Sequence, residues 1–255
     1  MPELAEVEFF RKRWHQAAAG QTITAVFTHD RAKVFRRRRT AAALRAALPG
    51  SKLRSSAAAA KQMCFRFGDD LWVGLHLGMS GELRAEPAGY APGKHDHLVL
   101  RTARHALVFT DPRMFGGVEF YRGAGTPGWW TRLAPPVLSD AFTADAVVMF
   151  LRRRARAPIK AVLLMQERFP GLGNWMADEV LWRECRHVCR LALATIAGRG
   201  DYLPPDLNAH IPTSWLFRHR WSDGGRCPKA GCPLVREEVG GRTTCWSPAR
   251  QKLRA

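Results

Sequence analysis

The sequence is poor in acidic residues relative to basic ones. Its 255 residues include 22 Asp and Glu against 40 Lys and Arg, which gives a formal net charge of +18 and a pI near 10.8. Solubility does not require so large an excess, which instead indicates a polyanionic partner, with nucleic acid as the first candidate. An anionic membrane surface is the competing partner.

Long apolar runs are also missing. No stretch reaches the roughly 20 residues that a membrane-spanning helix needs. The first ten residues carry Glu3, Glu6 and Glu8, whereas a secretory leader begins with basic residues. We therefore expect an intracellular monomer without a membrane partner, cytoplasmic and associated with the nucleoid in the manner of a bacterial protein.

A disulfide framework is absent as well. The cysteines have no regular spacing in a chain of this length without a leader, so reduced thiols are expected. The six are Cys64, Cys185, Cys189, Cys227, Cys232 and Cys245. Only the last three suggest a metal site.

The pattern of apolar residues and breakers changes along the chain. Residues 3–19 have apolar side chains near helical spacing, and β-type runs such as LWVGLHL (71–77) and ALVFTD (106–111) follow between Gly, Pro and Asp. Pro135 and Pro136 indicate a linker. Beyond it, three helical segments and the turn in VGGRTT predict helices and a hairpin; the helical segments span 140–154, 158–169 and 171–196.

These patterns predict an α+β, multidomain fold. An N-terminal helix with an antiparallel β-sandwich should occupy residues 1–130, followed by a linker at 131–139. A helical domain should occupy 140–200, and 201–255 should contain a connector and a C-terminal β-hairpin.

The first residues raise a question of chemistry. Removal of Met1 would leave Pro2 as a secondary amine beside the carboxylate of Glu3. A terminal amine has a reference pKa near 8 against about 10.4 for lysine, so much more of it is neutral at pH 7. Attack on a sugar C1′ would give an iminium ion that assists base loss and β-elimination, with Glu3 as proton donor and acceptor. Proline at this position also simply permits methionine removal, so these two residues alone leave the question open.

Six further segments occur in order: AAAAKQMCFRF, HLGMSGEL, KHDHLVLR, TDPRMFGG, PIKAVLLMQ and GLGNWMADEVLWR. With PELAEVE at the start, they resemble the formamidopyrimidine-DNA glycosylase and endonuclease VIII family of base-excision enzymes, from residue 1 to about 183 and again in the hairpin. The resemblance implies a bifunctional DNA glycosylase and AP lyase acting on damaged double-stranded DNA. Its substrates would be formamidopyrimidine and 8-oxoguanine-type lesions or oxidised pyrimidines, processed by β,δ-elimination.

The resemblance also implies the catalytic residues. Pro2 matches the Schiff-base nucleophile, Glu3 its acid/base partner, and Glu6 a residue of the lesion pocket. Lys61 matches the lysine that the family places in that pocket, although a lone lysine at a strand start is normally only solvated. Arg242 matches the arginine that grips the phosphates flanking the lesion and assists δ-elimination.

A second set matches residues that contact DNA. Met79 would enter the gap left by the extruded base, unless it is ordinary core packing, while Arg113 and Phe115 would contact the opposite base and wedge its stack. Phosphate contacts are expected from His95, Arg113, Arg156, Lys160 and Asn174. PGLGNW (170–175) supports the last of these, because backbone N–H groups and an asparagine at a helix start form a natural phosphate site.

Two positions and one segment in this part of the chain depart from the family pattern. Ala5 stands where proline is usual, and Met114 stands where a second arginine is common. After residue 183 the sequence lacks the turn between two helices, which predicts a truncated helix–two-turn–helix motif.

The family commonly ends in a hairpin that holds zinc through two Cys-x-x-Cys pairs. Aligned on VGGRTT, the four ligand positions are Cys227, Ala230, Ser247 and Arg250. Cys232 and Cys245 are out of register, and although three thiols with His219 could form a displaced site, their spacing does not fit a standard knuckle. We therefore predict a zincless finger, with no bound metal and no cofactor.

Two other functions remain open. A catalytically weak or inactive DNA-damage-binding relative would keep the charge and the intercalating residues, and the truncated helical motif favours it. A basic architectural or ribosome-associated protein would explain the net charge but not the ordered motifs.

Overall fold

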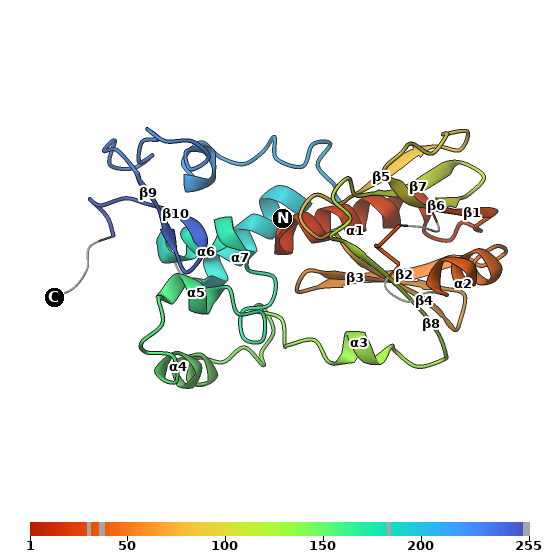
Figure 1. Ribbon diagram of the computed structural model, residues 1–255, viewed down its shortest axis with the longest axis horizontal. Coiled ribbons are helices and arrows are strands. Elements are labelled where there is room, and N and C mark those ends of the chain that lie inside the picture. The colour runs from red at the N-terminus through yellow and green to blue at the C-terminus, as the bar shows by residue number, and fades with distance from the viewer. Residues whose placement is uncertain (30–31, 36–38, 183–184, 252–255) are drawn as a thin grey trace. The chain divides into compact units, whose positions relative to one another are not determined.

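The computed structural model describes residues 1–29, 32–35, 39–182 and 185–251 (Figure 1). The chain forms two compact units. The first contains Met1–Pro2 and Glu6–Leu133, and the second contains Glu3–Ala5 and the chain from Ala134 onward. None of the helices in the described ranges is both long and apolar enough to cross a membrane.

The first unit is the predicted antiparallel sandwich. One sheet has the order β1-β6-β7-β5 and the other β2-β3-β4-β8. The first sheet contains β1 (Ala25–Thr28), β5 (Glu82–Pro87), β6 (Asp96–Arg101) and β7 (His105–Thr110). The second contains β2 (Leu53–Ala59), β3 (Gln62–Phe67), β4 (Leu71–His76) and β8 (Gly117–Arg122). Two short helices, α2 (Thr40–Ala47) and α3 (Gly128–Thr131), complete the unit.

The helix α1 (Leu4–Ala18) contacts both sheets through Trp14. Trp14 is fully buried, its ring lies 5.3 Å from that of Phe65 in β3, and its indole N–H donates to the carbonyl of Arg84 in β5. The helical spacing of Val7, Phe10 and Trp14, apparent in the sequence, therefore corresponds to the face that covers the sandwich core.

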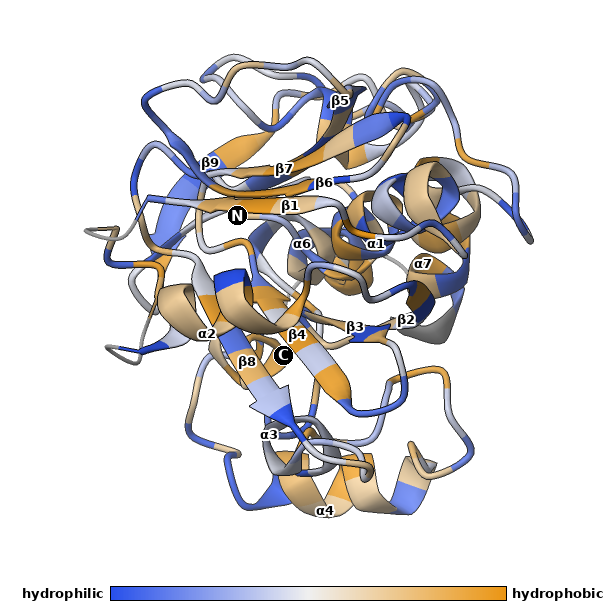
Figure 2. Ribbon diagram, turned by 90° about the vertical axis from the view of Figure 1, so that its right-hand side faces the viewer, coloured by the Kyte–Doolittle hydropathy of each residue, from blue (hydrophilic) through white to orange (hydrophobic). Residues whose placement is uncertain are grey.

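Strands β6 and β7 lie in the middle of their sheet and are buried on both faces. Figure 2 shows the hydrophobic character of β1 and β7. Val99, Ala106 and Val108 lie on one face of this sheet and form a small apolar cluster, against which Tyr90 packs. The connection between β5 and β6 is thereby anchored on the sheet.

The second unit consists of short helices and the predicted hairpin. The helices are α4 (Ala144–Arg152), α5 (Ile159–Leu163), α6 (Asn174–Trp182) and α7 (Cys185–Ala192), followed by a π-helical turn (Leu193–Ala197) and a 3₁₀ turn (Leu216–Arg218). The junction of α6 and α7, where the truncation is predicted, falls on residues outside the described ranges. The hairpin pairs β9 (Val235–Val239) with β10 (Arg242–Trp246). Its two turn residues, Gly240 and Gly241, have φ values of 59° and 72°, as the preferred two-residue hairpin turn requires.

The helical prediction for 158–169 is too long. Only α5 forms there, and the chain then turns back around Gln166. The side-chain amide of Gln166 donates to the carbonyls of Leu164 and Leu172, and its oxygen accepts the N–H of Gly171. The bond to Leu164 satisfies a carbonyl that a helix continuing to residue 169 would have paired internally, and the other two bonds hold the chain where it turns at 171–172. Strands β2, β5 and β8 and helix α2 were not predicted from the sequence.

Candidate active site and nucleic-acid interface

Glu3 is held at the start of helix α6. Its carboxylate accepts three backbone N–H groups, from Gly173 at 2.9 Å, Trp175 at 2.9 Å and Met176 at 3.0 Å. The side chain is almost fully buried, and the next residue, Leu4, donates its N–H to the carbonyl of Gly171. A helix start carries partial positive charge and unpaired N–H groups, so it stabilises this negative charge.

This arrangement corrects one expectation about phosphate binding. The backbone N–H groups of Gly173, Trp175 and Met176 are not available to a phosphate, because the protein's own carboxylate occupies them. Asn174 is the exception within the motif. Its side-chain oxygen has no hydrogen-bond partner in the described part of the chain, but this atom is an acceptor, so a phosphate contact would have to come from the side-chain NH2 group.

The remaining expected catalytic residues of the first unit lie near its start and at a hairpin tip. Pro2 is partly buried and directly precedes the fixed Glu3, while Glu6 is buried in the first turn of α1. Lys61 is in the two-residue turn joining β2 to β3, after Ala60, whose φ is 57°. A lysine in a hairpin turn is normally solvated, yet Lys61 is only 9% exposed. Its burial favours a specific role over a solvated one.

Two loops that carry expected DNA contacts are joined by one buried carboxylate. Asp111 accepts the hydroxyl of Ser80 at 2.8 Å, and it also accepts the N–H groups of Arg113 and Gly116. A Cβ added to Gly78 would lie 2.7 Å from the carbonyl oxygen of Phe115, so glycine is needed where the loops meet. Asp111 therefore fixes the loop at 77–81 against the loop at 111–116.

These joined loops expose large apolar side chains. Met79 and Met114 are each 37% exposed and Phe115 is 55% exposed. Met79 is thus not core packing. The guanidinium carbon of Arg113 lies 4.8 Å from the centroid of the Phe115 ring, which places a cation beside an exposed aromatic ring. Apolar wedges beside a cation suit insertion into a base stack.

The expected phosphate-binding cations differ in their exposure. His95, Arg113 and Arg156 are exposed, and so is Arg242, which directly follows the turn of the β9–β10 hairpin. Lys160 is not: it is 2% exposed, so the expected phosphate contact is not available in this structure. Its ammonium donates to the carbonyl of Thr243 at 2.7 Å and pairs with Asp178 at 2.7 Å.

Lys160 belongs to a buried ionic group that anchors the hairpin. Asp178 pairs with Arg220 at 2.7 Å as well as with Lys160, and it accepts the N–H of Cys245 in β10. Burial raises the pKa of Asp178 although both cations oppose it, and burial lowers the pKa of Lys160. The group links α5 and α6 to the hairpin strand that begins at Arg242.

The cysteines near the hairpin do not fit the family's zinc site. The sulfur of Cys227 accepts the N–H of Ala230, and the sulfur of Cys232 lies 3.5 Å from the hydroxyl of Ser247. Burial acts to raise the pKa of Cys227, but hydrogen bonds from Ser247, from the backbone of Ala230 and Lys229 and from Cys232 lower it, and the net shift is downward. Cys245 instead lies buried in β10, and burial raises the pKa of its thiol.

The other possible ligands are no better placed. The ring of His219 is engaged with the carbonyl of Thr213. Within the described ranges, no three His, Cys, Asp or Glu side chains are grouped so as to hold a metal ion. Two thiols and a hydroxyl do not supply the closed set of four N or S ligands that a structural zinc needs.

Sequence reasoning missed several residues that hold the site together. Asp111, Asp178 and Arg220 were not singled out, although Asp111 and Asp178 lie inside the quoted motifs TDPRMFGG and GLGNWMADEVLWR. Buried carboxylates next to glycine-rich loops are a usable signal, because such loops need acceptors for their free N–H groups. Arg220 had no local signal.

The sequence is similar to known formamidopyrimidine-DNA glycosylases. The sequence model of the family described as formamidopyrimidine-DNA glycosylase N-terminal domain matches residues 1–118. The formamidopyrimidine-DNA glycosylase of Laribacter hongkongensis (strain HLHK9) is 30% identical over 276 residues, covering 99% of this chain and 100% of the relative. That of Gluconobacter oxydans (strain 621H) is 35% identical over 284 residues, with the same two coverages.

Solved structures show the same fold. The Lactococcus lactis Fpg (MutM) in complex with DNA containing N7-benzyl-Fapy-dG has a TM-score of 0.78 and 24% identity, covering 99% of this chain and 100% of that one. A second complex of that protein, with DNA containing an oxidised pyrimidine, has the same TM-score and identity.

Proposed function

The chain belongs to the formamidopyrimidine-DNA glycosylase family, and from this premise we propose that it is a bifunctional DNA glycosylase and AP lyase that removes oxidised bases from double-stranded DNA. The observation that carries the proposal is the buried carboxylate of Glu3, fixed by three N–H donors immediately after Pro2. It places a carboxylate on the residue that directly follows the amine of Pro2 in the sequence.

The reaction would begin with the neutral amine of Pro2, after loss of Met1. Its lone pair attacks C1′ of the damaged nucleotide, the glycosidic C–N bond breaks, and the base leaves with that electron pair and takes up a proton. The sugar ring opens to give a C1′ iminium ion on Pro2. The carboxylate of Glu3 stabilises this cation and accepts protons in turn.

Strand cleavage would follow from the iminium ion. Loss of a proton from C2′ breaks the C3′–O bond, and a second elimination breaks the C5′–O bond; water then releases the sugar remnant from Pro2. The guanidinium of Arg242 would stabilise the departing phosphate through its fork of N–H donors. The buried ions Lys160, Asp178 and Arg220 would hold the hairpin that carries Arg242.

Base extrusion would be supported by the joined loops of the first unit. Met79 would fill the space left by the extruded base, and Phe115 and Arg113 would act on the opposite strand. Lys61 and Glu6 would contact the extruded nucleotide. The two lesion types in the Lactococcus lactis complexes, an imidazole-ring-opened purine and an oxidised pyrimidine, define the substrates to be tested first.

We further propose that this activity needs neither metal nor cofactor. The hairpin is held by strand pairing and by the buried ionic group, both of which use this chain's own atoms.

Borohydride trapping tests the proposal. The wild type should form a covalent adduct with duplexes carrying 8-oxoguanine, a formamidopyrimidine, an oxidised pyrimidine or an abasic site. Pro2→Gly should trap less efficiently than the wild type, because a primary amine forms an imine that must be protonated before it is cationic. A variant that retains Met1 should lose the adduct, because retention turns the amine of Pro2 into an amide. If Pro2→Gly traps as well as the wild type while Lys61→Ala does not, the nucleophile is Lys61.

A nicking assay on the same duplexes separates the other functions. Binding to the lesion without nicking would identify a noncatalytic damage-binding relative. Equal binding to damaged and undamaged DNA without nicking would identify a general architectural protein.

A further inference from the structure

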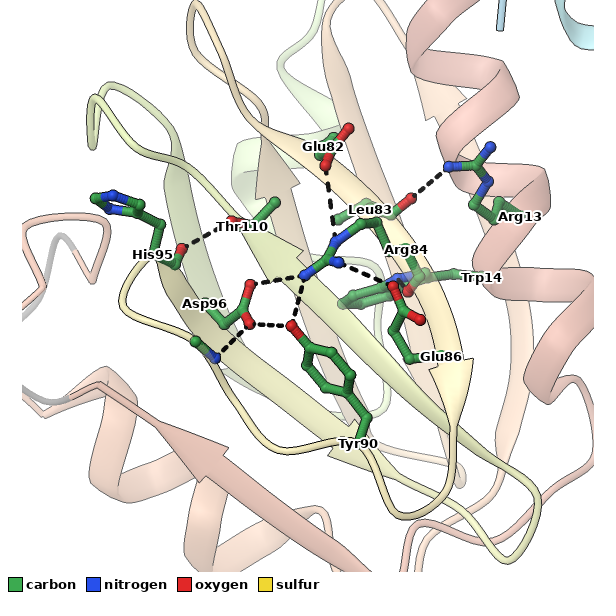
Figure 3. A network of polar contacts seen from close by, with 11 residues as sticks. Arg13, Trp14, Glu82, Leu83, Arg84, Glu86, Tyr90, His95, Asp96 and Thr110 are labelled. Carbon is green, nitrogen blue, oxygen red and sulfur yellow. Dashed lines mark hydrogen bonds and ion pairs between the residues drawn. The ribbon is translucent and has the colours of Figure 1, made fainter. Parts of the chain in front are cut away.

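A polar network centred on Asp96 lies at the start of β6 (Figure 3). The Asp96 carboxylate accepts the Tyr90 hydroxyl at 2.7 Å, the Gly93 N–H at 2.7 Å and the Arg84 guanidinium at 3.0 Å. The side chain is 3% exposed. Burial acts to raise the pKa of Asp96, but these hydrogen bonds and the charge of Arg84 lower it, so the carboxylate is ionised at neutral pH.

Arg84 connects this carboxylate to the sheet. Its guanidinium donates to Glu86 at 2.9 Å and to the Tyr90 hydroxyl at 2.9 Å, and it lies 3.7 Å from Glu82. Tyr90 in turn packs on the apolar cluster of β6 and β7. The network therefore has a rigid base, with its members drawn from β5, the following connection and β6.

The network closes a four-residue turn. The N–H of Asp96 donates to the carbonyl of Gly93 at 3.1 Å, while its carboxylate accepts the N–H of Gly93. The two central residues of the turn are Lys94 and His95, both exposed. The carbonyl of His95 also accepts the Asp111 N–H at 3.0 Å and the Thr110 hydroxyl at 3.1 Å. Figure 3 shows the His95 ring directed away from the network.

Lys94 and His95 are adjacent, and hydrogen bonds hold the backbone of their turn in place. Their side chains can therefore form an anion-binding contact that is already ordered before a ligand binds. Lys94 offers an ammonium, His95 a ring N–H, and neither backbone needs to be ordered when a ligand binds. The bond from the Asp111 N–H to the His95 carbonyl ties this turn to the loops that carry Met79 and Phe115, because the Asp111 carboxylate also fixes those loops. The turn thus has a defined place relative to the residues expected to enter the base stack.

We propose that Arg84, Tyr90 and Asp96 are positioning residues that hold the Gly93–Asp96 turn so that Lys94 and His95 together contact one DNA phosphate. This inference rests on the proposed function and deepens it, since it adds Lys94 as a phosphate ligand and assigns the network a role in DNA binding.

The sign of one substitution separates this role from simple electrostatics. Asp96→Asn removes a negative charge, and neutralising an acid on a DNA-binding protein by itself strengthens binding. A positioning role predicts the opposite, weaker binding. Asp70→Asn is the matched control: Asp70 forms an exposed ion pair with Arg122 at 2.9 Å on the other sheet, so the same change removes the same charge without loosening the turn.

The experiment measures the affinity of the full chain for a duplex carrying an uncleavable tetrahydrofuran abasic site, by fluorescence anisotropy at several salt concentrations. Lys94→Ala should weaken binding and reduce the slope of log K against log salt by about one, the value expected for one lost phosphate contact. His95→Ala should weaken binding as well. Asp96→Asn and Tyr90→Phe should weaken binding several-fold, and Asp70→Asn should leave it unchanged or slightly tighter.

A double-mutant cycle completes the test. In a Lys94→Ala/His95→Ala background, Asp96→Asn should cost no further affinity, since the contacts that it positions are gone. Thermal unfolding shows whether each variant is folded. If Asp96→Asn is unfolded, the affinity of Tyr90→Phe, which keeps the ring, tests the positioning role instead.

The outcomes distinguish the phosphate contact at Lys94 and His95 from the positioning role of the network around Asp96. If the Lys94 and His95 variants bind as the wild type does, no phosphate is contacted at this turn, and that part of the proposed function fails. If they bind weakly while Tyr90→Phe and Asp96→Asn bind normally, the phosphate contact stands and the positioning role is overturned. A loss with Asp96→Asn that persists in the double background also overturns it.

Discussion

The carboxylate of Glu3 occupies the space in which a side chain at position 173 would begin. A Cβ added to Gly173 would lie 2.6 Å from Cγ of Glu3 and closer still to the carboxyl group. The backbone of Gly173 does not have the positive φ that would itself require glycine. Glycine is therefore needed here for the approach of Glu3.

The first prediction follows from this pair. Gly173→Ala should displace the Glu3 carboxylate and lower the rate of borohydride trapping and nicking by about 100-fold, the scale of loss from a 1 Å displacement of a catalytic group. Affinity for a tetrahydrofuran duplex should change little. Gly125→Ala, at a position where a Cβ meets nothing within 4 Å, is the control and should be fully active. Normal activity in Gly173→Ala would remove Glu3 from the mechanism.

The second prediction concerns the buried ions. Asp178→Asn leaves Lys160 and Arg220 buried without their counter-charge and should destabilise the second unit by about 3–5 kcal/mol. Lys160→Met should lower the free energy of unfolding by less, because Asp178 and Arg220 still pair. Urea unfolding gives both values. A larger loss for Lys160→Met would mean that the bond from Lys160 to Thr243 outweighs the ion pair.

The third prediction is a pH dependence of stability. The pKa of Asp96 is lowered in the folded protein. The ionised carboxylate therefore contributes fully to the free energy of unfolding above the pKa of Asp in the unfolded chain, about 3.9, and this contribution is lost as the pH falls through the folded pKa. The difference in unfolding free energy between wild type and Asp96→Asn should therefore be constant from pH 7 to 5 and shrink below pH 4. Urea unfolding across this range measures it. A difference that instead grows below pH 4 would contradict the assignment.

The fourth prediction concerns the exposed apolar side chains. Met79→Ala and Phe115→Ala should slow base removal from a lesion duplex, because the extruded state loses the groups that fill and wedge the stack. Cleavage of an abasic site in single-stranded DNA should be unaffected, since no stack is opened. Single-turnover rates on the two substrates provide the comparison. Equal losses on both would point to a folding or binding defect instead.

The fifth prediction concerns metal and the hairpin. Purified protein should contain no stoichiometric zinc and should keep its activity in a chelator, while Arg242→Ala should lose DNA affinity and δ-elimination but still perform β-elimination. Elemental analysis and product mobility on denaturing gels report these results. One tightly bound zinc per chain, released together with activity, would show that Cys227, Cys232 and Cys245 form a rebuilt site.

The sequence by itself determined features that depend on local pattern. Apolar spacing predicted α1, short β-type runs between Gly, Pro and Asp predicted the central strands β3, β4, β6 and β7, and the Gly240–Gly241 pair predicted the hairpin turn. Backbone conformation at these places is chosen by neighbouring residues. The ordered motifs identified the family for the same reason, since each is a short segment. The edge strand β1 was predicted, but the edge strands β2, with its run of small residues, β5 and β8 gave no such pattern and were missed.

Only the tertiary structure decided which groups are free to act. The bond from Glu3 to Met176 spans 173 positions of sequence, and no local pattern shows that a carboxylate at the start of the chain occupies the N–H groups of a distant helix. Burial likewise turned Lys160 from an expected phosphate ligand into an internal ion, and packing on β6 and β7 placed Tyr90 beneath the turn of His95. Charge and hydrogen-bonding capacity are properties of a residue type, but whether they face solvent, substrate or another side chain is set by long-range packing.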